Sequence, residues 1–361
     1  MEVIRARYSL DHRHGRRALG EALAAIGETE AARCLWLDTE TTGLAGGTGT
    51  YVFLTGLAYV EGSALVTEQL LLRRLSGEQR MLAALHDRLR GARRLVTFNG
   101  RRFDWPILEA RFVLARQSPA VVEAHTDLIH AARWLWHRVL GTHRLSSIED
   151  TVLGAPRPDD VPGWRIPGMY VDYLRTTDRK LLDPVLTHNR ADLLAMITLH
   201  GEVARILRDP HGSDVPLDWE GAGVLLAREG RHGPALTCFD RALAETHEPR
   251  ERWRILRRLV RQHRALGQSE LVQACWEEET ARWRRPDLFR AHVLEEAAKA
   301  RGRRGDITGA RQAAEEALRI VGTLHRAPAA VVARRGTPAQ DPSRIEERLA
   351  ARLARLNGVC P

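Results

Sequence analysis

Short apolar runs separated by turns dominate the first part of this chain. One begins at residue 35, two cover residues 51–60 and 65–72, and two more are expected at 95–98 and 124–127. Runs of this length that end in glycine, asparagine or serine are typical of β-strands. The pattern predicts five strands, of which the first three form an antiparallel meander.

Segments with helical spacing lie between some of these strands. Over residues 76–90 four apolar side chains recur on one face, and Gly91 follows as a stop signal. A second helix is expected between the fourth strand and the fifth. Strands that alternate with helices in this way predict an α/β fold, in which helices flank a mixed sheet.

The pattern changes after residue 207. Strand signals stop, and helices rich in alanine, leucine, arginine and glutamate take their place. Residues 208–216 contain two prolines and predict a linker. We therefore expect a second, all-α domain over residues 217–361.

The second region also carries a repeating pattern. Its first helices resemble a tetratricopeptide repeat, with small residues where paired helices pack closely, at Trp219, Gly223, Ala235, Phe239 and Ala242. Comparable positions recur 37 residues after Phe239, at Trp276, and 38 residues later, at Ala314. Residues 344–356 are expected to close the array by covering its apolar edge. An ordinary helical bundle without a binding groove stays open as the alternative.

Residues 1–30 precede the first predicted strand as a basic extension. Their segment 5–17 is rich in arginine and histidine. Two interpretations are open: an arm that lies along a phosphate backbone, or a disordered terminus.

Length, net charge and apolar content limit the kinds of protein that this chain can be. With 361 residues the chain is long enough for two domains. Its formal charge of +9 and its isoelectric point near 10.1 favour a polyanionic partner, although genome base composition alone can produce a bias toward arginine. No stretch approaches the roughly twenty apolar residues of a membrane span, and no secretory signal is visible. A cytoplasmic protein without a membrane partner is expected.

The first predicted strand ends in two carboxylates, Asp38 and Glu40, before a turn rich in threonine and glycine. Side chains alternate along an extended backbone, so both carboxylates project to the same side and can address one cation. Burying two like charges is costly without a cation. A metal site and an exposed acidic strand end are the two interpretations of this motif alone.

Two later segments add candidates. Asp104 follows the turn that ends the fourth strand, so it is either a third metal ligand or the N-cap of the following helix. His188 precedes Asp192 by four residues in a segment with helical spacing, which places both on one helix face. By itself such a pair is typical of a surface interaction.

Together these segments resemble the three exonuclease motifs of the DnaQ-like (DEDD) superfamily of 3′-to-5′ exonucleases. The order of the motifs and their strand, loop and helix contexts agree, and the matching acids are Asp38, Glu40, Asp104 and Asp192. His188 matches the His-type subgroup by its chemistry. Its offset of four residues from Asp192 is instead that of the Tyr-type subgroup.

A closer resemblance, over about residues 31–207, is to the RNase H-like domain of YprB-type proteins. The motifs that carry it are Asp38-Thr39-Glu40-Thr41-Thr42-Gly43-Leu44, Gly47-Thr48-Gly49-Thr50-Tyr51, Phe98-Asn99-Gly100, Phe103-Asp104, Ile166-Pro167-Gly168, Asp172-Tyr173-Leu174-Arg175 and His188-Asn189. This resemblance implies an α/β RNase H-like fold. It says little about the substrate, because fold does not determine function.

The resemblance also implies a chemistry, the two-metal hydrolysis of a phosphodiester. Asp38 would bridge both ions, Glu40 and Asp192 would complete the first site, and Asp104 would hold the second. All-oxygen ligands suit Mg²⁺ or Mn²⁺. His188 would be the general base, because an unperturbed histidine has a pKa of about 6.5, near the pH of the reaction.

Four residues beside these motifs are candidates for contacts with nucleic acid. Thr41 and Gly43 belong to a glycine-rich turn that lets a strand end approach the backbone, and Asn99 and Arg101 flank the second motif. A flexible hairpin connection and a solvated arginine are the structural alternatives. No Gly-Lys-Ser/Thr follows the glycines, so the turn is not a Walker loop.

The function expected from these features is a metal-dependent nuclease that removes nucleotides from a free 3′ end, with DNA favoured over RNA. Two alternatives stay open: a catalytically weak nucleic-acid-binding scaffold that acts through its repeats, and a structure-specific endonuclease. A protein partner for the second domain also stays open, since repeat arrays often present a concave surface.

Overall fold

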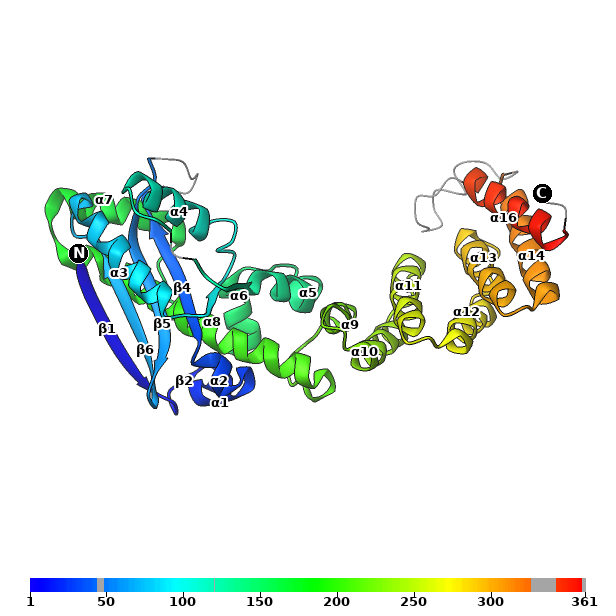
Figure 1. Ribbon diagram of the computed structural model, residues 1–361, viewed down its shortest axis with the longest axis horizontal. Coiled ribbons are helices and arrows are strands. Elements are labelled where there is room, and N and C mark those ends of the chain that lie inside the picture. Colours follow the sequence, from blue (N-terminus) through cyan, green and yellow to red (C-terminus); the bar gives the residue numbers. More distant parts are fainter. Residues whose placement is uncertain (44–48, 120, 326–341, 359–361) are drawn as a thin grey trace. The chain divides into compact units, whose positions relative to one another are not determined.

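The chain divides into two compact units, Met1–Asp218 and Trp219–Pro361 (Figure 1). The computed structural model describes residues 1–43, 49–119, 121–325 and 342–358. The first unit combines strands and helices, and the described part of the second is helical. An α/β region followed by a mostly helical one confirms the predicted fold class.

A mixed sheet of six strands forms the centre of the first unit. Its order is β1-β6-β5-β4-β7-β8, with antiparallel pairing from β1 to β4 and parallel pairing from β4 to β8. The strands are β1 (Glu2–Ser9), β4 (Cys34–Thr41), β5 (Val52–Glu61), β6 (Ala64–Leu71), β7 (Arg94–Thr97) and β8 (Ala124–Asp127). The five predicted strands are therefore present, and β1 is an addition.

Helices cover both faces of this sheet. They are α1 (Leu19–Ile26), α2 (Glu28–Ala31), α3 (Glu78–Arg90), α4 (Asp104–Leu114), α5 (Leu128–Leu140), α6 (Leu145–Ile148), α7 (Ile166–Thr176) and α8 (Asp183–Arg208). A 3₁₀ turn at Leu75–Gly77 leads into α3, where the sequence predicted one continuous helix.

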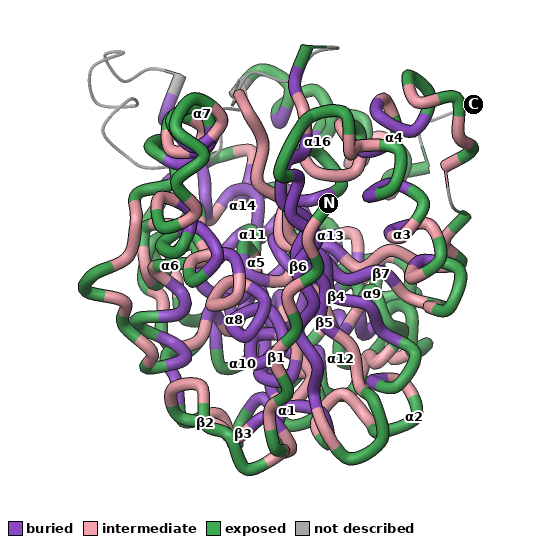
Figure 2. Tube along the Cα trace, turned by 90° about the vertical axis from the view of Figure 1, so that its left-hand side faces the viewer, coloured by how far each residue is buried: buried purple, intermediate pink, exposed green. Residues whose placement is uncertain are grey.

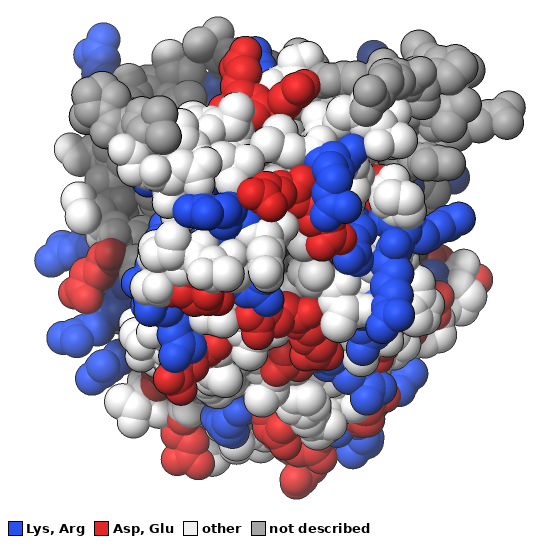
Figure 3. Space-filling model, turned by 90° about the vertical axis from the view of Figure 1, so that its right-hand side faces the viewer, with Lys and Arg blue, Asp and Glu red and all other residues white. Residues whose placement is uncertain are grey.

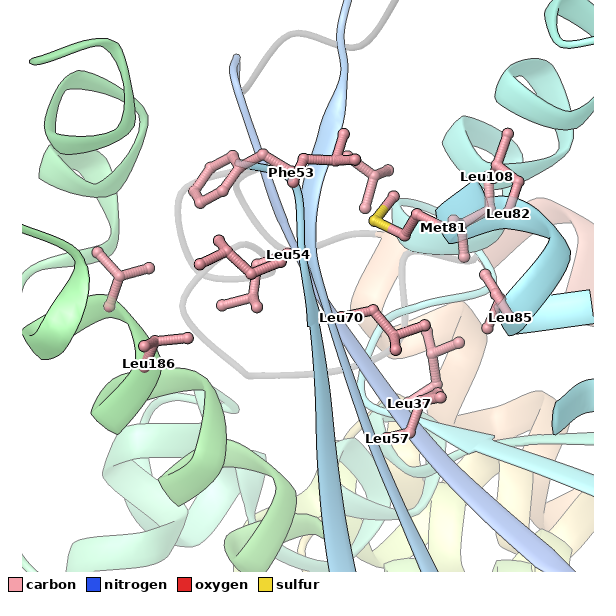
Figure 4. Close-up of a cluster of buried hydrophobic side chains, with 14 of the residues drawn as sticks. Leu37, Phe53, Leu54, Leu57, Leu70, Met81, Leu82, Leu85, Leu108 and Leu186 are labelled. Atoms are coloured by element: carbon pink, nitrogen blue, oxygen red, sulfur yellow. The ribbon is translucent and has the colours of Figure 1, made fainter. Parts of the chain in front are cut away.

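The core lies on both sides of the sheet (Figure 4). On one side Leu37 and Leu57 face Met81 of α3, and on the other Leu54 faces Leu186 of α8. All five side chains are buried, and the tube in Figure 2 is mostly purple over the central strands. Burial on both faces fixes the position of β4, so its polar end is held rigidly.

The N-terminal segment corrects the sequence analysis. Residues 2–9 are neither an arm on a phosphate backbone nor a disordered terminus, because β1 pairs with β6 along its whole length. Ile4, Ala6 and Tyr8 are partly buried, whereas Arg5 and Arg7 between them are exposed. The basic side chains are thus the outward positions of an edge strand, where charge discourages further pairing.

The remainder of residues 1–30 also belongs to the first unit. A two-stranded hairpin, β2 (Arg13–His14) and β3 (Arg17–Ala18), precedes α1, and α1 packs against α8. A Cβ atom on Gly201 would lie 2.5 Å from the Cα atom of Ala22, so this close helix contact requires a glycine.

The segment predicted as a linker, residues 208–216, folds onto the first unit. The Asp214 carboxylate lies 2.6 Å from Arg17 and 2.6 Å from Arg205, and Val215 is buried. Two arginines that share one aspartate hold this segment in place.

The second unit is a run of helices in which each described helix from α9 to α14 packs against the next. They are α9 (Trp219–Arg228), α10 (His232–Glu245), α11 (Pro249–Ala265), α12 (Ser269–Arg282), α13 (Leu288–Arg303), α14 (Ile307–His325) and α16 (Pro342–Leu356). A Cβ atom on Gly223 would lie 2.7 Å from the Phe239 ring, in agreement with the small residue expected there. The tetratricopeptide assignment itself stays a prediction.

The last described helix, α16, places Ile345 and Leu349 in one apolar cluster with α13 and α14. On the face drawn in Figure 3, acidic and basic side chains are interspersed and do not form one continuous basic surface. None of the helices that the structure describes combines the length and apolar character that a transmembrane segment needs.

Candidate active site

The structure brings all five predicted catalytic residues to one end of the sheet. Asp38 and Glu40 lie on β4, Asp104 is the first residue of α4, and His188 and Asp192 lie one turn apart on α8. The Nε2 atom of His188 is 3.3 Å from Asp192 and 3.8 Å from Glu40. Three segments far apart in sequence therefore converge on one cluster.

A buried amide connects β4 to α8. Asn189, which is fully buried, donates a hydrogen bond of 2.8 Å to Asp38 and accepts one of 2.8 Å from Gln69 on β6. A Cβ atom on Gly56 of β5 would lie 2.2 Å from the Asn189 side chain. Only glycine at position 56 therefore lets Asn189 reach the Asp38 carboxylate.

A hydroxyl connects β4 to α4. Thr39 donates a hydrogen bond of 2.5 Å to the Asp104 carboxylate. Phe103, not Asp104, occupies the N-cap position of α4, so the alternative of Asp104 as a simple helix cap is wrong. Its carboxylate faces the strand that carries Asp38 and Glu40.

Asp127 has a structural task in the turn before α4. Its two oxygens accept hydrogen bonds from the backbone N–H groups of Asn99, at 2.6 Å, and Arg101, at 3.1 Å. Asn99 has a φ of 66°, in the left-handed region. Asp127 thus holds in shape a turn that contains a left-handed residue.

A loop after the short π-helical segment Glu149–Leu153 supplies two further charged groups. Both oxygens of Asp160 lie close to Nδ1 of His188, at 2.8 and 2.9 Å. Arg157 is 2.6 Å from Asp192 and also forms an ion pair with the buried Glu149. The His188–Asp192 pair is therefore surrounded by charged side chains.

Burial and mutual repulsion shift the titration of the acids. Burial, and then the neighbouring Asp192, Glu40 and Asp104 carboxylates, raise the pKa of Asp38 well above its usual value. The pKa of Glu40 is raised in the same way, and burial raises that of Asp104 to about 6. Burial also raises the pKa of Asp192, which His188 and Arg157 partly offset. The cluster therefore holds more negative charge than its own surroundings neutralise.

The donor set fits a hard divalent cation. Four carboxylates offer only oxygen, which Mg²⁺ and Mn²⁺ prefer, and burial together with repulsion between neighbouring carboxylates raises their pKa values. Within the described residues, however, no group of three or more His, Cys, Asp or Glu side chains stands ready to hold a metal ion. Several carboxylate oxygens instead accept hydrogen bonds from Asn189, Thr39 and Arg157. Cation binding would require the four carboxylates to turn about these contacts.

The four candidates for nucleic-acid contact lie beside this cluster. The Thr41 hydroxyl donates to the Gly43 carbonyl oxygen at 2.8 Å, and the exposed Arg101 side chain donates to the backbone carbonyl of His125. Asn99 is partly buried. Most of the glycine-rich turn, residues 44–48, lies outside the described residues.

Sequence reasoning missed Asn189, Arg157 and Asp160 as parts of the site. Asn189 adjoins His188 and belongs to a motif that carried the resemblance, which was the available signal. Arg157 and Asp160 lie in a loop without apolar periodicity, so no pattern pointed to them. Only the fold brings that loop against α8.

Comparison with known proteins supports this architecture. Residues 35–204 match the RNase_H superfamily, whose members are mostly nucleases that use divalent metals. Over 221 residues the chain is 33% identical to the uncharacterized protein YprB of Bacillus subtilis (strain 168), a match that covers 56% of this chain and 53% of that relative. The chain thus spans about half the length of the relative. Residues 35–204 therefore form an RNase H-like domain, and the chain is distantly homologous to YprB over about half of its length.

Proposed function

We propose that this protein is a metal-dependent 3′-to-5′ exonuclease that hydrolyses phosphodiester bonds, with DNA favoured over RNA. The observation that carries the proposal is the convergence of four electrostatically strained carboxylates and one histidine. Such a cluster destabilises the fold, and groups with strongly shifted pKa values are typical of functional sites.

Asp38, Glu40, Asp104 and Asp192 would hold two divalent cations, Mg²⁺ or Mn²⁺. When bound, such ions orient the attacking water, neutralise the phosphate and stabilise the departing 3′ oxygen. The buried Asn189 keeps one Asp38 oxygen in place, and Thr39 does the same for Asp104. These hydrogen bonds limit the reorientation that the acids need.

His188 would act as the general base. Its Nε2 atom faces the carboxylate cluster, with Asp192 and Glu40 on the same side of the ring. A water bound among these acids would be within reach of Nε2, which would accept its proton during attack on the phosphorus atom. The proton would then pass to solvent, since the ring is partly exposed.

The second unit would place the substrate and take no part in hydrolysis. The basic excess of the chain lies in this unit, where residues 219–361 contain 27 arginines and lysines against 19 aspartates and glutamates. A net charge of this sign favours a polyanion. The same unit would serve a protein partner if the chain were a scaffold.

The direct test is the release of mononucleotides from end-labelled DNA and RNA strands in Mg²⁺ or Mn²⁺. We expect release from the 3′ end that stops on chelation and falls to background in Asp38→Ala and Asp192→Ala. A matched control is Asp159→Ala, which removes an exposed acid from the neighbouring loop. Equal cleavage in wild type and both site variants would refute the assignment.

Two further substrates separate the alternatives. Cleavage of a closed circular strand would identify an endonuclease, because a circle has no 3′ end. Tight binding of nucleic acid without cleavage, unaffected by Asp38→Ala, would instead identify a scaffold.

A further inference from the structure

Asp160 is the nearest partner of the His188 ring and stands outside the four-acid cluster. Both Asp160 oxygens lie within 2.9 Å of Nδ1, whereas the contacts of Nε2 are longer, 3.3 Å to Asp192 and 3.8 Å to Glu40. The two ring nitrogens are therefore not equivalent.

The hydrogen bond with Asp160 determines which ring nitrogen of His188 carries the proton. An ionised carboxylate only accepts hydrogen bonds, so Nδ1 must donate to Asp160. A neutral imidazole carries one N–H, and the shorter contact keeps it on Nδ1. The lone pair then lies on Nε2, the nitrogen that faces the carboxylate cluster and any water bound there.

The loop that carries Asp160 is itself anchored. Arg157 lies 3.4 Å from Asp160 and pairs with Glu149, whose side chain is 1% exposed. Glu149 also meets His14 of the β2–β3 hairpin at 2.9 Å, and the Arg16 N–H donates to the Leu153 carbonyl oxygen at 2.7 Å. The N-terminal hairpin, which precedes the residues matched to the superfamily, thus braces the loop beside the site.

We propose that Asp160 is a positioning residue of the reaction: through Nδ1 it fixes the orientation and tautomer of His188, so that Nε2 accepts the proton. This inference rests on the proposed function. A base held in one orientation and tautomer loses less freedom in the transition state, and its protonated form is stabilised by the adjacent carboxylate. Asp160 acts on the reaction only through His188.

The first test needs neither metal nor activity. In the metal-free chain with ¹⁵N-labelled histidine, the resonances that His188→Gln removes belong to His188. At a pH where this ring is neutral, the wild type should show the Nδ1–H tautomer, and Asp160→Asn should shift the ring toward Nε2–H. The same tautomer in both proteins, or Nε2–H in the wild type, would overturn the proposal.

The second test is kinetic. Asp160→Asn should lower kcat by about 10- to 100-fold, leave KM and Mn²⁺ affinity unchanged, and be partly rescued in Asp160→Glu. The double variant Asp160→Asn/His188→Gln should be no slower than His188→Gln alone. The matched control is Asp159→Asn, in which the neighbouring exposed acid loses its charge without effect.

Other kinetic outcomes count against the proposal. Additive losses in the double variant would mean that Asp160 acts independently of His188, and weaker Mn²⁺ binding in Asp160→Asn would make Asp160 a metal ligand. A wild type without nuclease activity would refute the proposed function and leave the tautomer measurement to decide whether Asp160 orients the ring.

Discussion

Two groups of acids in this molecule stand in opposite electrostatic surroundings. Glu295 of the second unit meets Lys299 at 2.7 Å and Arg348 at 2.9 Å. Burial raises its pKa, but these cations and His292 outweigh burial and hold the pKa well below the usual value. Asp38 and Glu40 instead face other carboxylates, and their pKa values are raised.

An acid with a lowered pKa occurs in the first unit as well as in the second. Glu68 lies in the same sheet as Asp38, and hydrogen bonds from Arg88 and Arg5 overcome its burial and lower its pKa. The fold therefore supplies cations to buried acids where they serve structure. At the end of β4 the one arginine that meets the four acids among the described residues is Arg157, on Asp192. Under the proposed function, divalent cations would supply the positive charge that this cluster lacks.

The largest expected effect belongs to the base. His188→Gln should reduce kcat by about 100- to 10,000-fold, because glutamine keeps hydrogen-bonding capacity but cannot accept the proton. Mn²⁺ affinity, measured by calorimetry, should change little because the four acids remain. A loss of Mn²⁺ binding equal to that of Asp38→Asn would make His188 a ligand and contradict its role as base.

Removing the charge of an acid that pairs with cations of the chain should lower the stability of the folded protein. Glu295→Gln should destabilise the second unit by about 2–3 kcal/mol, because Arg348 and Lys299 lose a charged acceptor. Hydrogen exchange of peptides from α13 and α16 measures this locally. The control is Glu278→Gln, an acid 76% exposed, which should change stability by less than about 0.5 kcal/mol.

An acid in the unneutralised cluster should behave in the opposite way. Asp38→Asn keeps the size of the side chain and removes one negative charge from the cluster, so the metal-free first unit should be more stable by about 1 kcal/mol. Denaturant unfolding in a chelator measures the change. A clear loss of stability would show that Asp38 serves the fold and would remove the contrast with Glu295.

The smallest expected effect is a difference in pH dependence. Groups with raised pKa values bind protons first in the folded state, so their contribution to metal-free stability rises as pH falls from 7 toward about 4. The contribution of Glu295 is complete above its ordinary pKa of about 4.3 and declines below it. The stability of the first unit should therefore depend less on pH in Asp38→Asn than in wild type. Equal slopes would contradict the raised pKa values.

The spacing of residues along single strands and helices predicted the features that depend only on neighbouring positions in the sequence. Asp38 and Glu40 share a side because strands alternate, and His188 and Asp192 share a face because helices turn every 3.6 residues. The edge strand β1 was missed although Ile4, Ala6 and Tyr8 alternate with polar positions. Its exposed arginines gave this segment the composition of a basic tail, although its apolar residues recur with a period of two.

The remainder of the site depends on distant contacts that no local period encodes. Asn189 reaches Asp38 only because Gly56 lacks a side chain on the facing strand. Asp160 meets His188 because a loop is braced by Glu149 and His14. Such contacts follow from the packed sheet and helices, so a single sequence does not reveal them.

The central claim is that the four-acid cluster awaits divalent cations, and a Mn²⁺ titration of the full chain tests it most directly. By calorimetry and thermal unfolding, wild type and Asp159→Asn should bind Mn²⁺, and a concentration 100 times Kd should add about 2.7 kcal/mol of stability. Asp38→Asn and Asp192→Asn should lose this binding. Absence of binding in wild type at saturating Mn²⁺, or undiminished binding in both variants, would contradict the account.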